Sequence, residues 1–296
     1  MYRIKYYFVK VLQKLNLLSR FNFYLTKTIN EERIKVPLTN GIGLSNFILT
    51  SNWLDSLIRQ FVNENNKTFI DVGVNIGQSL LRLKTLKPAT EYLGFEPNST
   101  CTSYAQQLVK LNRFNNCTLQ NCALSQKTQI MELEKTFVDD SRASVIASLR
   151  PAYFSSKESI LALNYDSFYL ERKISFIKID VEGGELEVLQ GMKESIMKHE
   201  PLITCEVLDY HDESTFEFAQ TRATQLTELL RSVNYAIIHL ETSKSNHNIV
   251  AFKKIDSILL KQWTPLSSYS NDYLFFPQNM ENEVLTKLKN SIIISL

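Results

Sequence analysis

Long apolar runs are missing from this chain of 296 residues, and so is a large excess of either charge. No stretch of about 18 apolar residues occurs, so we expect no membrane-spanning helix. The formal net charge is only +2. Proteins that bind nucleic acids usually carry a marked basic excess, so we expect no nucleic-acid partner. Both absences favour an ordinary globular protein.

Cysteine is scarce, and the spacing of the few cysteines argues against a zinc site. Cys101, Cys117, Cys122 and Cys205 lack the close pairs that bind zinc. No signal peptide is visible, so we expect a cytoplasmic protein with free, buried thiols.

The first thirty residues differ from the rest in charge. Residues 1–30 hold six basic residues and no acid, which leaves a net charge of −4 for the remainder. This basic, aromatic-rich segment either lies as a helix on the inner face of an anionic membrane or packs on the protein with its lysines in solvent. We favour packing, because the charge is modest. We expect residues 1–66 to form a helical segment packed on a domain of residues 67–296.

From residue 67 onward, short apolar runs alternate with helical patterns. The strand candidates are 68–74, 90–96, 116–121, 174–181, 202–207, 235–240 and 272–276, and the helix candidates are 76–86, 98–113, 185–198, 215–233 and 281–292. Such alternation predicts an α/β fold whose mostly parallel seven-stranded sheet has helices on both faces. Residues 235–276 hold two strands without a clear helix between them, which predicts an antiparallel edge hairpin. This arrangement is typical of Rossmann-like class I methyltransferases.

Four predicted strands end on an acid. Asp71, Glu96, Asp180 and Glu206 each follow an apolar run. The carboxyl ends of parallel strands share one edge of the sheet, where ligands bind in open α/β folds. An edge this acidic suits a ligand with positive charge or several hydroxyl groups.

The segment Phe69–Gly77 predicts a strand, a glycine turn and a helix that approach a nucleotide-like ligand. Glu96 follows Gly77 by 19 residues, close to the spacing of ~20 at which an acid binds a ribose. The third glycine of the dinucleotide fingerprint is missing. Ribose without pyrophosphate, together with an ammonium and a sulfonium, is what S-adenosylmethionine offers.

Several motifs resemble those of the FkbM family of S-adenosylmethionine-dependent methyltransferases, most of which methylate hydroxyl groups of sugars, polyketides and other small molecules. The similar stretches are 69–77, 94–98, 176–185, 188–191 and 271–276. The resemblance implies that Asp71, Gly73, Asn75 and Gly77 surround the methionine part of the cofactor and that Glu96 binds the ribose.

The same resemblance places Asn121, Cys122 and Ala123 beside the adenine. Asn121 has an equally good explanation as an ordinary residue at a strand end.

Asp180 and Glu182 are the candidate catalytic residues, since both follow the strand at 174–181. Methyl transfer to an alcohol requires loss of a proton, and a positioned carboxylate can accept it. Alternatively, the pair holds a divalent cation that acidifies the hydroxyl, or Glu182 and Glu185 only cap the helix predicted at 185–198. Lys178 could stabilise the pair electrostatically.

Three further residues are weaker candidates for substrate binding: Asp166, Glu206 and His211. The segment 139–165 either contributes to the acceptor pocket or forms a surface loop.

The sequence therefore predicts an S-adenosylmethionine-dependent O-methyltransferase that acts on a saccharide or another small molecule. A second hypothesis is a nicotinamide-dependent oxidoreductase, but the third glycine of the dinucleotide fingerprint is missing. A third hypothesis is a membrane-associated scaffold without catalysis, but the motif residues are intact.

Overall fold

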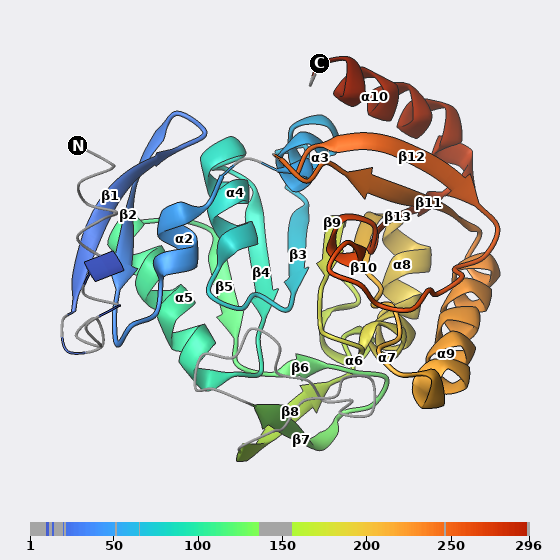
Figure 1. Cartoon of the computed structure of the whole chain (residues 1–296), viewed down its shortest axis with the longest axis horizontal. Helices are drawn as coiled ribbons and strands as arrows, with labels where there is room; N and C mark the ends of the chain where they lie inside the picture. Colours follow the sequence, from blue (N-terminus) through green and yellow to red (C-terminus); the bar gives the residue numbers. More distant parts are fainter. Residues whose placement is uncertain are drawn as a thin grey trace.

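A twisted sheet runs across the molecule (Figure 1). The computed structural model describes residues 22–50, 52–64, 66–135, 156–245 and 247–294, with isolated positions 10, 11, 14 and 20. Within these residues the sheet has eight strands in the order β12–β11–β13–β10–β9–β3–β4–β5. The strands are β3 (Thr68–Val72), β4 (Glu91–Phe95), β5 (Cys117–Gln120), β9 (Ile174–Ile179), β10 (Leu202–Glu206), β11 (Tyr235–Thr242), β12 (Ile249–Ile255) and β13 (Asp272–Pro277).

Strand directions confirm the predicted fold class. The five strands from β5 to β10 are parallel, and β13 runs antiparallel between β10 and β11. The predicted number of seven strands was one too low, because β12 pairs antiparallel with β11 at the edge. Its sequence carries Lys253 and Lys254 and is half exposed, as edge strands often are, so it lacks the apolar run of the central strands.

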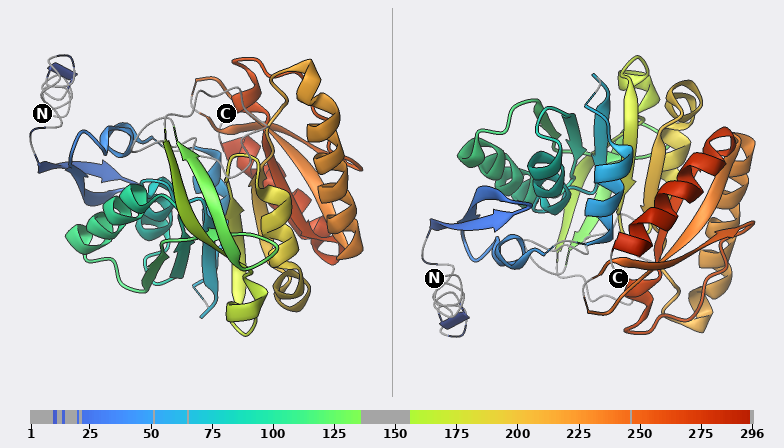
Figure 2. Two further views of the ribbon diagram at one scale, coloured as in Figure 1. Left: turned by 90° about the horizontal axis from the view of Figure 1, so that it is seen from below. Right: turned by 90° about the horizontal axis from the view of Figure 1, so that it is seen from above.

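Helices cover both faces of the sheet, because successive strand residues point to opposite sides. Phe69 packs in one core, whereas its neighbour Ile70 packs in the other. Over the first face lie α3 (Trp53–Phe61), α4 (Gln78–Leu86), α5 (Ser99–Asn112) and α10 (Glu281–Ile294), of which Figure 2 shows α3 and α10 in the view from above. Over the second lie α7 (Glu185–Gly191), α8 (Lys193–His199) and α9 (Glu213–Ser232).

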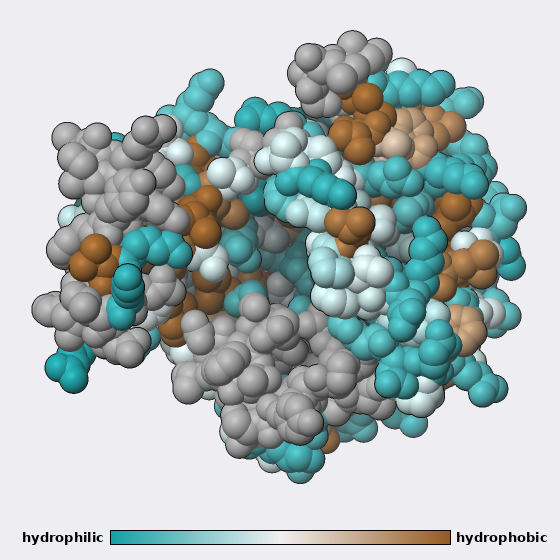
Figure 3. All heavy atoms as spheres, viewed as in Figure 1, coloured by the Kyte–Doolittle hydropathy of each residue, from teal (hydrophilic) through white to brown (hydrophobic). Residues whose placement is uncertain are grey.

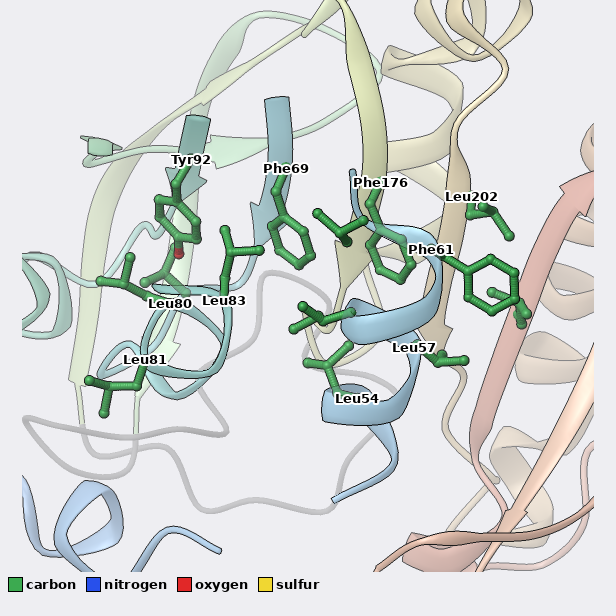
Figure 4. Close-up of a cluster of buried hydrophobic side chains, with 14 of the residues drawn as sticks. Leu54, Leu57, Phe61, Phe69, Leu80, Leu81, Leu83, Tyr92, Phe176 and Leu202 are labelled. Atoms are coloured by element: carbon green, nitrogen blue, oxygen red, sulfur yellow. The ribbon is translucent and has the colours of Figure 1, made fainter. Parts of the chain in front are cut away.

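The first core is densely aromatic. Leucines of α3 and α4 point toward the side chains of three neighbouring strands (Figure 4). The rings of Phe69 and Phe176 stack with their centroids 5.2 Å apart. An ion pair between buried Asp55 and Arg82, 2.7 Å long, joins α3 to α4. These contacts hold α3 close to the strand ends.

The helix predicted at 185–198 is interrupted. It forms α7 and α8, with non-helical backbone at Met192. Gly191 passes so close to another segment that an added Cβ would lie 2.2 Å from the carbonyl oxygen of Ser125. The periodicity of the sequence continues across this break and does not reveal it.

The N-terminal segment contains a hairpin where the sequence predicted helix. Strands β1 (Phe23–Ile29) and β2 (Glu32–Leu38) pair antiparallel, and α2 (Leu44–Ile48) follows. Asn30 and Glu31 both have positive φ, as a two-residue hairpin turn requires. The prediction for residues 1–30 otherwise lies mainly outside the described residues, so membrane contact stays a prediction, as does the boundary near 66.

A second, three-stranded sheet adjoins the carboxyl ends of β3 and β4 (Figure 1). It consists of β6 (Ala123–Leu124), β7 (Gln129–Lys135) and β8 (Ser156–Leu163), followed by the short α6 (Asp166–Tyr169). Two short 3-10 helices, η3 (Ser267–Tyr269) and η4 (Gln278–Met280), flank β13. Most of the segment predicted to help bind the acceptor lies outside the described residues, between β7 and β8.

The face of the molecule shown in Figure 3 is largely hydrophilic, with hydrophobic side chains in separate patches. None of the helices in the described part of the chain has the length and apolar character needed to cross a membrane.

Candidate active site

A cavity of about 240 Å³ lies at the carboxyl ends of the central strands. The ends of β3, β4 and β9 form one side, and β6 and β7 of the small sheet contribute apolar residues. Its lining residues are Val72, Gly73, Asn75, Phe95, Glu96, Pro97, Ala123, Leu124, Leu133, Asp180, Val181, Glu182, Gly184, Val188 and Glu206. The cavity thus gathers Gly73, Asn75, Glu96, Ala123, Asp180, Glu182 and Glu206 from the predicted site residues.

The glycine turn is packed against the end of β9. A Cβ on Gly73 would lie 1.9 Å from the carbonyl oxygen of Asp180, and φ there is +83°. Only glycine allows this approach. Gly77, also with positive φ, is the N-cap of α4 and does not line the cavity.

Glu96 presents a buried carboxylate that the backbone holds in place. Its Oε2 accepts a hydrogen bond from the N–H of Asn75 at 2.8 Å, and its Oε1 accepts one from the N–H of Asn98 at 2.8 Å. Burial raises the pKa of Glu96 to about 7, while these two N–H groups favour the ionised form. The carboxylate therefore has a defined orientation at the cavity wall.

The side chain of Asn121 contacts the backbone on either side of the Glu96–Pro97 peptide bond. Its Nδ2 donates to the carbonyl oxygens of Glu96 and Pro97, at 2.9 and 3.0 Å. Asn121 does not line the cavity, although Ala123 two residues later does. Its contacts agree with the alternative explanation as a structural residue at a strand end.

The side chain of Asp71 also lies behind the cavity wall. It is fully buried, accepts a hydrogen bond from the hydroxyl of Tyr92 at 2.7 Å, and lies 3.3 Å from the Nζ of Lys178. Lys178 donates to the carbonyl oxygen of Gly73 at 2.7 Å. Asp71 therefore supports the glycine turn through Lys178 and does not border the cavity.

Lys178 also approaches Asp180, with 3.4 Å between Nζ and Oδ2. Burial alone would lower the pKa of Lys178, but the charges of Asp71 and Asp180 raise it above its ordinary value. The ammonium group therefore stays charged and stabilises the ionised form of Asp180.

Asp180 and Glu206 form a hydrogen-bonded pair of carboxyl groups. Burial raises the pKa of Glu206 well above its ordinary value, and the charges of Asp180 and Asp272 raise it further. The Nζ of Lys178 lies 3.4 Å from Oδ2 of Asp180, and this positive charge favours the ionised form of the Asp180 carboxyl group.

Asp272 belongs to the same cluster and was not predicted. It opens β13, directly opposite Glu206 in the antiparallel pairing. Burial and then the charge of Asp180 raise the pKa of Asp272 to about 7, against the effect of Lys178. The sequence signal was available, because Asn271 and Asp272 stand at the start of a predicted strand. Only the antiparallel direction of β13 brings that start to the carboxyl end of β10.

Glu182 lines the cavity from a strained turn. Its φ is 58°, and that of Gly183 is 112°. The N–H of Gly183 donates to Oε1 of Glu185 at 2.8 Å, and Arg222 on α9 donates to the carbonyl oxygen of Gly183 at 2.8 Å. These contacts fix the turn that precedes α7.

Replacement of Glu185 by glutamine should change how stability depends on pH. Burial raises the pKa of Glu185 from 4.5 to about 7. The unfolded chain therefore releases this proton first, and the wild-type protein loses stability as the pH rises from about 4.5 to about 7. Glu185→Gln removes this loss. The free energy of unfolding of the variant, relative to that of the wild type, should therefore be up to about 3 kcal/mol higher above pH 7 than at pH 4.5.

Thermal melts of both proteins between pH 4.5 and 8.5 measure this difference. Glu217→Gln, an exposed substitution on α9, is the control and should follow the wild type. A constant offset between Glu185→Gln and wild type across this range contradicts the prediction.

Asp166 and His211 are not among the residues that line the cavity, so their role in substrate binding stays a prediction. The Oδ2 and Oδ1 atoms of Asp166 accept hydrogen bonds from the N–H groups of Glu194 and Ser195, at 2.8 and 3.0 Å. The ring of His211 stacks on Trp263, with centroids 4.9 Å apart. Asp166 therefore stabilises the start of α8.

Loss of that contact should affect folding only. Asp166→Ala should lower the free energy of unfolding by about 1 to 2 kcal/mol, as for other helix caps. Urea denaturation measures this, with the exposed Asp256→Ala as the control. An unchanged unfolding free energy would return Asp166 to the list of substrate-binding candidates.

The cavity also contains apolar residues that sequence reasoning missed. Leu124 and Leu133 come from β6 and β7, which were not predicted as strands. The alternation of apolar and polar residues in 131–134 was a usable signal for β7. For a metal, the described residues contain no group of three or more His, Cys, Asp or Glu suited to hold one.

Strand order, the antiparallel β13 and a nucleotide-type cavity at the strand ends together define a class I methyltransferase fold. The chain belongs to the FkbM methyltransferase family: residues 71–262 match the model of the methyltransferase FkbM domain. No curated protein matches the chain.

Among solved structures, the chain is similar to methyltransferase FkbM from Methylobacillus flagellatus, with 18% identity and a TM-score of 0.44 over 71% of this chain and 44% of that one. It therefore spans less than half the length of that protein. It is also similar to a SAM-dependent O-methyltransferase from Thermotoga maritima, with 9% identity and a TM-score of 0.38 over 75% of this chain and 64% of that one. A third is precorrin-6y C5,15-methyltransferase from Geobacter metallireducens, with 11% identity and a TM-score of 0.37 over 75% and 85%.

Proposed function

We propose that this protein is an S-adenosylmethionine-dependent methyltransferase that methylates a hydroxyl group of a saccharide or another small molecule. The observation that carries this proposal is the combination, in one cavity, of the oriented carboxylate of Glu96 with the pair Asp180 and Glu206. The carboxylate of Glu96 suits a ribose. The carboxyl groups of Asp180 and Glu206 suit a cationic group and a proton transfer.

The residues present fit the cofactor. Each oxygen of Glu96 accepts one backbone N–H and retains a lone pair for a ribose hydroxyl. Ala123, Leu124 and Leu133 offer an apolar wall for the flat adenine. The backbone of Gly73, without a side chain, leaves room for the amino-acid part. The carboxylates Asp180 and Glu182 favour the ammonium and sulfonium charges.

The cofactor supplies an electrophilic methyl group bound to a sulfonium. An acceptor hydroxyl that receives this methyl group would have to lose its proton, and the carboxylate of Asp180 would accept it. Lys178, whose Nζ lies 3.4 Å from Oδ2 of Asp180, favours the ionised form of Asp180, which is the form that can accept this proton.

Calorimetric titration with S-adenosylhomocysteine tests the cofactor assignment, with NADH as the competing ligand. We expect binding of the first and none of the second. Binding of NADH without binding of S-adenosylhomocysteine would support the alternative that the protein is an oxidoreductase. A screen with labelled S-adenosylmethionine against lipid-linked sugars, nucleotide sugars and glycans then identifies the acceptor.

A further inference from the structure

The hairpin of β1 and β2 has one face in solvent, and the charges on that face are positive. Side chains alternate between the two faces of a hairpin, so Tyr24 and Thr28 of β1 share this outer face with Arg33 and Lys35 of β2. All four residues are exposed. The opposite face of the hairpin packs on the first core.

The two acids of the hairpin do not offset these charges on the outer face. Glu31 lies in the turn, with a φ of 69°. Glu32 directly precedes Arg33 in the strand, so its side chain belongs to the opposite face. The outer face of the hairpin therefore carries cations and no acid.

The end of α5 extends this positive surface. The side chain of Asn112 donates to the carbonyl oxygen of Lys35 and accepts the N–H of Lys35, both at 2.8 Å, so this end of α5 lies beside β2. The hairpin and α5 occupy one end of the molecule (Figure 2). Lys110 and Arg113 are exposed there, and α5 has no acid. A helix C-terminus favours cations, which explains these two but not Arg33 and Lys35.

Together, Arg33, Lys35, Lys110 and Arg113 form what we call the basic face. None of the four forms an ion pair within the described part of the chain. None of them lines the cavity at the strand ends. These cations therefore neither neutralise a carboxylate nor take part in the proposed chemistry. An exposed surface with charges of one sign attracts a partner of the opposite sign.

Two features favour a flat anionic surface as this partner. Residues 1–30, which lead into the hairpin, add six basic residues and no acid, whereas residues 31–296 have a net charge of −4. Attraction for anions is therefore strongest at this end of the protein. Tyr24 is 51% exposed, and the Nζ of Lys35 lies 5.3 Å from the centroid of its ring. Tyrosine and lysine side chains are both favoured at membrane interfaces.

We propose that the basic face binds the surface of an anionic phospholipid bilayer. Its cations approach the lipid phosphates, and the ring of Tyr24 enters the headgroup layer. The first thirty residues alone carry a modest charge for such binding, and the basic face supplies four more cations. The inference does not depend on the proposed function, because no residue of this face lines the cavity.

Cosedimentation of the full-length protein with vesicles tests this inference. One set of vesicles contains phosphatidylcholine alone, and the other also contains about 30% phosphatidylglycerol, at an ionic strength of about 0.1 M. We expect the wild type to bind only the anionic vesicles. In the variant with Arg33→Glu, Lys35→Glu and Arg113→Glu, the partition coefficient should fall at least about 100-fold, since each cation near an anionic surface contributes a factor of about five.

The matched control reverses three exposed lysines elsewhere: Lys193→Glu, Lys244→Glu and Lys253→Glu. It changes the net charge by the same amount, and its partition coefficient should stay within about fivefold of the wild type. Thermal melts establish that each variant is folded. The double variant Lys110→Gln and Arg113→Gln leaves the hairpin untouched, and it should lose at least about tenfold in partition coefficient.

Four results would overturn the inference. Equal binding to neutral and anionic vesicles, or no binding to either, excludes electrostatic binding to a bilayer. Wild-type binding by the folded variant of Arg33, Lys35 and Arg113 excludes the basic face as the membrane contact. Equal losses in the two triple variants show that net charge, rather than the basic face, decides binding. Tighter binding to a single-stranded oligonucleotide than to anionic vesicles, lost in the basic-face variant, assigns this face to a nucleic acid.

Discussion

Glu96→Ala should abolish measurable binding of S-adenosylhomocysteine. The carboxylate would make two hydrogen bonds to the ribose, and hydrogen bonds to charged groups contribute about 1.5–3 kcal/mol each. Their loss corresponds to an increase in Kd of roughly 10²–10⁴-fold. Isothermal titration calorimetry of wild type and variant measures the change.

The control for this prediction must separate binding from folding, because Glu96 also accepts the N–H groups of Asn75 and Asn98. A melting curve shows whether the variant remains folded. Glu132→Ala changes an exposed carboxylate on β7 that pairs with Lys157 and does not line the cavity, so it should bind like the wild type. A folded Glu96→Ala protein with wild-type affinity would show that Glu96 does not hold the ribose.

Asp180→Asn should lose turnover while it keeps the cofactor. Asparagine has nearly the shape of aspartate but cannot accept the proton of the acceptor hydroxyl. A positioned base contributes typically ~10²–10⁴-fold to the rate, so we expect kcat to fall by that factor. Transfer of a labelled methyl group to the acceptor found by screening gives kcat, and calorimetry gives the affinity for S-adenosylhomocysteine.

Glu182→Gln provides the comparison, because Glu182 lines the same cavity from the turn that follows β9. We expect a smaller loss of kcat in this variant. Full activity in Asp180→Asn would disprove the assignment of the base, and an equal loss of cofactor affinity would make Asp180 a binding residue instead.

The positions of many cavity residues could be predicted from the sequence, because the central strands are parallel. An acid that follows an apolar run of a parallel strand must lie at the carboxyl edge of the sheet, so Glu96, Asp180 and Glu206 could be placed together. The turn at Gly73 could also be predicted from the sequence, because a glycine directly after a strand indicates a close approach of the backbone.

The sequence did not predict which way the polar side chains near the strand ends point. Asp71 follows an apolar run as Glu96 does, yet it lies within β3, and its side chain contacts Tyr92 and Lys178 in the interior. The side chains of Asn121 and Asp166 were predicted to contact a ligand, but they form hydrogen bonds with backbone groups that are close in space. Each of these outcomes depends on partners more than 20 residues away in the chain.

The sequence by itself determined the α/β fold, the family motifs and the acidic edge, because these follow from local periodicity and from the geometry of parallel strands. Tertiary structure alone decided that Asp272 joins this acidic edge. Asp272 and Glu206 come from distant parts of the chain, and only the reversed direction of β13 brings them opposite each other. A site built from such distant segments leaves no local pattern in the sequence.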